Sequence, residues 1–160
     1  MSGFDRPPAI QPTGIFAGLR PGAILLGVAF DNLATLLLSP LLVAVFAGST
    51  GSGEAAGLSE EALAALSRSP EFLLASLVVG LGCTAAGAYV GARRAGCHFV
   101  RHGAWIGVCA ALVGLALYPA PAPARPLPPL WFDLAGFALL LPSGALGGLL
   151  AGTAAARRAA

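Results

Sequence analysis

The fold class of this chain is decided by residues 21–48, PGAILLGVAFDNLATLLLSPLLVAVFAG, whose single charged residue is Asp31. A helix needs about 20 mostly apolar residues to cross the hydrocarbon core of a bilayer, and this run exceeds that length. A cleavable signal peptide is the competing interpretation, but its apolar region would be only about 7–15 residues long. We therefore predict an uncleaved membrane-spanning helix here.

Three further stretches are apolar enough to cross a membrane. They lie at about residues 72–92, 103–118 and 131–152, and the intervening loops are 49–71, 93–102 and 119–130. These lengths predict an all-α polytopic membrane protein with four transmembrane helices arranged as two hairpins. We expect residues 1–160 to form a single membrane domain.

The composition of the chain excludes other classes of protein. Of its 160 residues 57% are hydrophobic and only 10% are charged, and the mean hydropathy is +0.83. A soluble domain has about 25% charged residues, and this chain has too little polar sequence to cover a compact core of its size. The net charge of +2 is too small for a nucleic-acid-binding face. A soluble domain, a disordered chain and a nucleic-acid-binding protein are therefore excluded.

Two connecting segments have clear local signatures. Residues 59–68, SEEALAALSR, begin with Ser59 as an N-cap and have acidic residues in the first turn, which predicts a short amphipathic helix on the periplasmic surface. Ser69 and Pro70 are typical of the N-cap and first position of the next helix. Residues 119–129 contain six prolines, which predicts a stiff polyproline connection.

The arginines predict the orientation in the membrane. All nine basic residues are arginine, which, with abundant alanine and glycine, is typical of a GC-rich bacterial genome. Seven of them, Arg6, Arg20, Arg93, Arg94, Arg101, Arg157 and Arg158, fall on one side of the predicted spans. Cytoplasmic segments are enriched in basic residues, so we predict a bacterial inner-membrane protein with both termini in the cytoplasm. Anionic lipid headgroups are the expected partners of Arg93, Arg94, Arg101, Arg157 and Arg158.

Small residues recur four positions apart in several spans. The candidate helix-packing residues are Cys83, Gly87 and Gly91 in the second span, Gly103 and Gly107 in the third, and Gly144, Gly148 and Gly152 in the fourth. Such residues share one helix face, and their small side chains let helix backbones approach closely in lipid. Packing within the chain is the favoured use, and assembly into a homo-oligomer or a larger membrane complex is the alternative.

Asp31 and Asn32 form a candidate ion or proton site. An ionised carboxylate near the bilayer midplane is costly unless it faces protein or water, so an acidic residue there indicates function or a specific partner. One hypothesis is a proton- or cation-linked residue. The other is a polar pair bonded to a neighbouring helix through Ser76, Thr84 or Ser143.

His98 and His102 are four residues apart, with Cys97 beside them. On a helix the two histidines would share a face and could ligate a metal ion, but no third and fourth ligands are evident. We favour contact with lipid headgroups for both histidines. The chain also lacks a nucleophile–base pair, a phosphate-binding loop and a zinc-protease motif, so we expect no cofactor, no metal and no enzymatic activity.

Three segments carry a likeness to known proteins: GAYVGARRAG at 87–96, RHGAWIG at 101–107 and GALGG at 144–148. In these the chain resembles a broad set of small uncharacterised prokaryotic four-helix integral membrane proteins. The likeness covers about the last 80 residues and does not include Asp31 or the proline-rich segment. It implies the architecture of four spans and no particular activity.

Two functions are compatible with these features. The favoured hypothesis is a non-enzymatic small integral membrane protein that acts by helix packing as a structural or accessory subunit. The alternative is a small oligomeric transporter or channel that uses Asp31 as its proton- or cation-linked residue. A water-filled cavity reaching Asp31 would favour transport, whereas a dry, closely packed bundle would favour the structural role.

Overall fold

The structure is a computed structural model and describes residues 14, 16–49, 59–117 and 128–159. Its helices are α1 (Pro21–Ser49), α2 (Glu60–Leu66), α3 (Pro70–Ala95), α4 (Phe99–Ala116) and α5 (Leu130–Ala159). All but α2 are long and apolar enough to cross a membrane. The chain is therefore an all-α polytopic membrane protein, as predicted. Most of the proline-rich segment at 119–129 lies outside the described residues.

The predicted loop at 93–102 is mostly helical, so that prediction was wrong. Helix α3 continues to Ala95 and α4 already begins at Phe99. The chain reverses within this short gap because Gly96 and His98 both adopt positive φ, +68° and +44°. Helix α5 also continues beyond the predicted end of its span, to Ala159.

The predicted helix starts are confirmed in atomic detail. The Ser59 hydroxyl accepts a hydrogen bond from the Ala62 N–H at 3.2 Å, and the Ser69 hydroxyl accepts one from the Phe72 N–H at 3.1 Å. Each serine satisfies an amide that a helix leaves without an internal partner in its first turn. The ring of Phe72 packs edge-on against the ring of Phe46, with 5.4 Å between the ring centroids. This contact connects the start of α3 to the end of α1.

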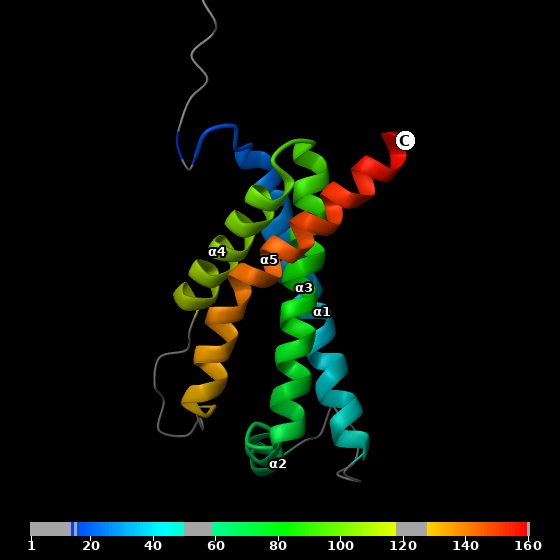
Figure 1. Cartoon of the computed structure of the whole chain (residues 1–160). Coiled ribbons are helices and arrows are strands. Elements are labelled where there is room, and N and C mark those ends of the chain that lie inside the picture. The colour runs from blue at the N-terminus through cyan, green and yellow to red at the C-terminus, as the bar shows by residue number, and fades with distance from the viewer. Residues whose placement is uncertain (1–13, 15, 50–58, 118–127, 160) are drawn as a thin grey trace, which may run out of the picture.

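The spans are arranged as two helical hairpins, α1 with α3 and α4 with α5 (Figure 1). Helix α5 also crosses α3, so that all four spans meet in the half of the bundle that holds the turn between α3 and α4. Towards the end that holds α2, the two hairpins diverge (Figure 1). Where they meet, Ile106 of α4 is completely buried, close to the backbones of Gly27 and Gly91.

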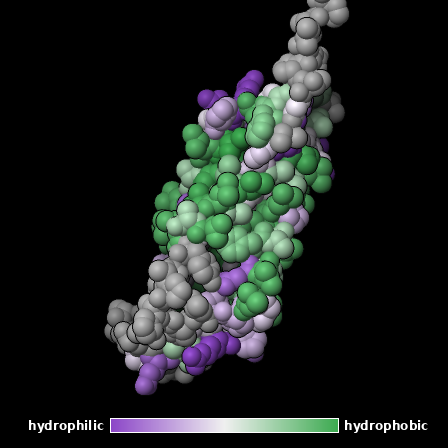
Figure 2. Space-filling view, turned by 90° about the vertical axis from the view of Figure 1, so that its left-hand side faces the viewer, coloured by the Kyte–Doolittle hydropathy of each residue, from purple (hydrophilic) through white to green (hydrophobic). Residues whose placement is uncertain are grey.

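The two ends of the bundle carry different charges. The end that holds the start of α1 and the last turns of α5 has six described arginines, Arg20, Arg93, Arg94, Arg101, Arg157 and Arg158. The opposite end has Glu61, Arg68, Glu71 and Asp133. Figure 2 shows a broad apolar belt between hydrophilic ends, as expected for a surface that faces lipid.

Candidate functional site

The backbones of α1 and α3 touch at two glycines, and this contact positions the candidate site. A Cβ atom placed on Gly87 would lie only 2.5 Å from the carbonyl oxygen of Gly27, and one placed on Gly27 would lie 2.9 Å from that of Gly87. Residues four apart share a helix face, so Asp31 follows Gly27 along the contact. Its carboxyl group is thereby brought against α3.

Asp31 makes a buried hydrogen bond across this interface. The Thr84 Oγ1 atom lies 3.1 Å from Asp31 Oδ1, and the two residues are only 1% and 6% exposed, respectively. Thr84 Oγ1 also lies 3.2 Å from the carbonyl oxygen of Gly80. The hydroxyl has one hydrogen for these two acceptors. The Thr84 hydroxyl, shared between these two acceptors, therefore connects the Asp31 carboxyl group to the backbone of α3.

The remaining polar candidates do not join Asp31. The Asn32 amide nitrogen donates to the Val28 carbonyl oxygen at 2.8 Å, within its own helix. The Ser143 hydroxyl donates to the Leu81 carbonyl oxygen at 2.6 Å and so links α5 to α3. Of the three partners considered for Asp31 from sequence, only Thr84 makes a hydrogen bond with it. The role of Asp31 and Asn32 as an ion or proton site stays a prediction.

The glycines of α4 and α5 pack against each other. A Cβ atom at Gly103, Gly107, Gly144 or Gly148 would come within 3.0 Å of backbone atoms in the facing helix. The same pattern recurs in the first hairpin, where a Cβ at Gly91 would lie 2.6 Å from the carbonyl oxygen of Ala23. These glycine faces therefore form helix–helix contacts within the chain.

The contact at Gly152 is looser than those at the other predicted packing glycines. A Cβ at Gly152 would meet the Phe99 side chain at 3.4 Å, an ordinary van der Waals distance. Cys83 is buried, with 4% exposure, and carries a free thiol. Gly147, which the sequence analysis did not single out, instead meets α3, where its Cβ would lie 2.9 Å from that of Ala88.

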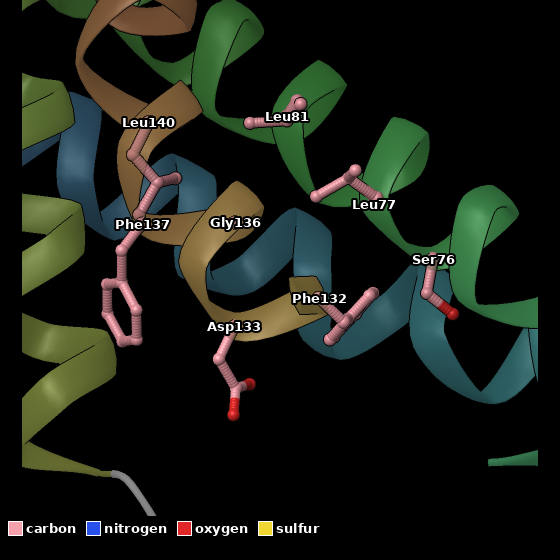
Figure 3. A pocket seen from close by; sticks show the side chains of 8 residues that line it. All are labelled: Ser76, Leu77, Leu81, Phe132, Asp133, Gly136, Phe137 and Leu140. Atoms are coloured by element: carbon pink, nitrogen blue, oxygen red, sulfur yellow. The ribbon is translucent and has the colours of Figure 1, made fainter. Parts of the chain in front are cut away.

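A cleft of about 240 Å³ opens between α3 and α5 where the hairpins diverge (Figure 3). Its walls are apolar and include Leu77, Leu81 and Leu140, and the Asp133 side chain points towards the end that holds α2. Asp31 is not among the residues that line it. This cleft therefore does not supply the water access to Asp31 that transport would need.

His102 has a structural role that was not predicted from the sequence. It is completely buried, so the predicted headgroup contact was wrong for this histidine. Its Nε2 accepts a hydrogen bond from the Arg20 N–H at 3.0 Å, and its Nδ1 lies 3.1 Å from the His98 carbonyl oxygen. Because Nε2 accepts a hydrogen bond, the ring proton is on Nδ1. The Nδ1–H group then donates a hydrogen bond to the His98 carbonyl oxygen. The only feature of the sequence that pointed to this role was the four-residue spacing between His98 and His102.

The arginines differ in their surroundings. Arg101 is half-buried and donates from one guanidinium nitrogen to the Ala17 carbonyl oxygen at 2.9 Å and from another to that of Gly14. Arg93 donates to the Tyr89 hydroxyl at 3.2 Å. The side chains of Arg94, Arg157 and Arg158 are exposed. The headgroup contacts of all five arginines stay predictions.

The described residues contain no group of three or more His, Cys, Asp or Glu side chains that could hold a metal ion. Comparison with known protein families, with curated proteins and with solved structures gives no match for this chain. The helices thus define a class, the multi-pass helical membrane proteins.

Proposed function

We propose that the chain is a small structural or accessory subunit of a membrane assembly and acts by helix packing, without catalysing a reaction. One observation carries this proposal. Asp31, the acidic residue farthest from the helix ends within the described spans, is buried and hydrogen-bonded to Thr84 at a close backbone contact. A polar pair of this kind fixes the register of two helices in lipid.

The outer surface of α1 supports an assembly role. Only a small part of this helix is buried, and Leu25, Leu33, Leu36, Leu37 and Leu41 are all more than half exposed. In a membrane such a face contacts lipid or the helix of another subunit. The glycine faces, by contrast, are already occupied within the chain.

Native mass spectrometry of the protein extracted in mild detergent tests this proposal. We expect a defined complex heavier than the 15.9 kDa chain, formed by further copies or by another membrane protein. A species that stays monomeric under every extraction condition, including chemical crosslinking before extraction, would contradict a subunit role.

For location, we propose the inner membrane of a bacterium, with both termini in the cytoplasm. The support is the charge asymmetry. Six described arginines lie at the end where α1 begins and α5 finishes, and among the described arginines only Arg68 lies at the other end. Basic residues are retained on the cytoplasmic side of bacterial inner membranes.

A small oligomeric transporter or channel is the second candidate function. The observation that favours it is the depth of Asp31, which follows the start of α1 at Pro21 by about 15 Å along the helix. A carboxyl group at that depth is able to exchange a proton if water reaches it. Ion flux through reconstituted protein distinguishes the two functions.

A further inference from the structure

A groove separates the first turn of α4 from the last turns of α5. Its volume is about 510 Å³. Phe99 and Val100 line it on α4, and Leu149 and Ala156 line it on α5, whereas His98 and Arg101 contribute polar groups. Val100 and Leu149 are 47% and 50% exposed. The groove therefore offers apolar walls beside the cationic side chain of Arg101.

The helix lengths place this groove at the level of the lipid headgroups. Helix α4 has 18 residues, or about 27 Å, which nearly matches a hydrocarbon core of about 30 Å. Helix α5 has 30 residues, or about 45 Å, so its last turns extend beyond that core. The groove between the start of α4 and the last turns of α5 thus lies where acyl chains join their headgroups.

The charge at this end selects the kind of headgroup. The described acidic residues other than buried Asp31 lie at the opposite end of the bundle. Arg101 lines the groove, and its guanidinium group keeps its positive charge while it donates to the carbonyl oxygens of Ala17 and Gly14. Arg157 does not line the groove but lies one helical turn after Thr153, a lining residue, on the same face of α5. Arg158 is also exposed but points about 100° further around the helix. An anionic group in the groove would therefore face Arg101 and Arg157.

We propose that this groove is a binding site for a single anionic phospholipid. The phosphate group lies by Arg101 and Arg157, and an acyl chain lies along Phe99, Val100 and Leu149. The occupant needs both parts, because a soluble phosphate has no chain for the apolar walls and a lipid without net charge gains little from the arginines. This site goes beyond the proposed subunit role and does not depend on it.

Native mass spectrometry of the detergent-solubilised full chain tests the site with two lipids of identical acyl chains, phosphatidylglycerol and phosphatidylcholine. We expect one phosphatidylglycerol to be retained in preference to phosphatidylcholine. Arg157→Gln should weaken the retention of phosphatidylglycerol about five-fold, as expected for one arginine at a lipid surface. Arg158→Gln removes the same charge from the next position and should leave retention within about two-fold of wild type, because the Arg158 side chain points away from the groove.

Three results would overturn the proposal. Equal retention of the two lipids by the wild type would show binding without headgroup selection. Equal losses in Arg157→Gln and Arg158→Gln would show a diffuse electrostatic attraction. Displacement of phosphatidylglycerol by excess glycerol phosphate would show a site for a soluble phosphate.

A second variant tests the groove through its shape. Gly152→Leu should fill the groove and abolish the preferential retention of phosphatidylglycerol, because a leucine side chain at this lining position extends beyond the ordinary 3.4 Å contact that a Cβ would make with Phe99. Undiminished retention by a Gly152→Leu protein with wild-type helical content would place the lipid elsewhere and contradict the site. If this variant does not fold, the pair of arginine variants decides the question alone.

Discussion

The Thr84 hydroxyl lies 3.1 Å from the Oδ1 atom of Asp31 and joins α3 to α1 inside the membrane-spanning part of the chain. This distance depends on the neighbouring glycines, because any side chain at Gly27 or Gly87 would collide with the backbone of the other helix. Glycine spacing and the buried polar pair therefore form one structural unit. If α1 slid by a turn along α3, both the close contact and the hydrogen bond would be lost.

Replacing Thr84 should destabilise the bundle. Thr84→Val keeps the shape of the side chain but leaves the buried Asp31 carboxyl without its partner on α3, and we expect a loss of about 1–2 kcal/mol in the free energy of unfolding. Thr153→Val is the matched control, because the exposed Thr153 hydroxyl bonds only within its own helix. Unfolding in mixed micelles measures both changes. Equal stability of the two variants would show that the Asp31–Thr84 hydrogen bond does not stabilise the bundle.

Two glycines of α4 should respond to alanine with opposite signs. At Gly107 a Cβ would collide with the backbone at Leu140, so Gly107→Ala should cost about 1–3 kcal/mol. At Gly114 the nearest atom to a Cβ is on Phe137 at 3.6 Å, so Gly114→Ala should stabilise the helix by about 0.5–1 kcal/mol. Thermal unfolding in detergent compares the two, and a shift of the same sign in both would contradict the tight contact between α4 and α5.

The two histidines should also behave differently. His102→Leu removes the acceptor for the Arg20 N–H and the donor to the His98 carbonyl, and we expect it to cost about 2 kcal/mol. His98→Gly should instead stabilise the protein by about 1 kcal/mol, because His98 has a left-handed backbone that disfavours residues other than glycine. Circular dichroism during thermal unfolding checks both, and a His102→Leu protein as stable as wild type would argue against the buried link.

Much of this architecture follows from local sequence, because lipid requires long apolar helices and because Ser59 and Ser69 cap helices whatever surrounds them. The start of α4 does not follow from local sequence. Residues before Gly103 were expected in a loop, yet they are helical around His102, whose partner on Arg20 is distant in sequence. Which glycine face meets which helix was equally unpredictable, since several spans carry the same small-residue spacing. For the same reason Thr84 could not be chosen over Ser76 or Ser143 as the partner of Asp31.

The proposed orientation predicts which end of the bundle is accessible from outside the cell. In a chain whose own three cysteines are replaced by alanine, Glu71→Cys should react with a membrane-impermeant maleimide added to intact spheroplasts, and Arg94→Cys should react only after lysis. The structure places these two positions at opposite ends of α3. The reverse labelling pattern would mean that the arginine-rich end faces outwards.

The central claim is that Asp31 joins two helices and does not carry ions, and flux into proteoliposomes tests it most directly. Purified wild type and Asp31→Asn are reconstituted at equal density, and proton and cation fluxes are measured under imposed pH and potential gradients. We predict that neither protein exceeds empty vesicles and that both unfold at similar temperatures, because an asparagine amide preserves the shape and the hydrogen bond to Thr84. A wild-type flux that Asp31→Asn abolishes while the fold stays intact would contradict the account and establish the transporter in its place.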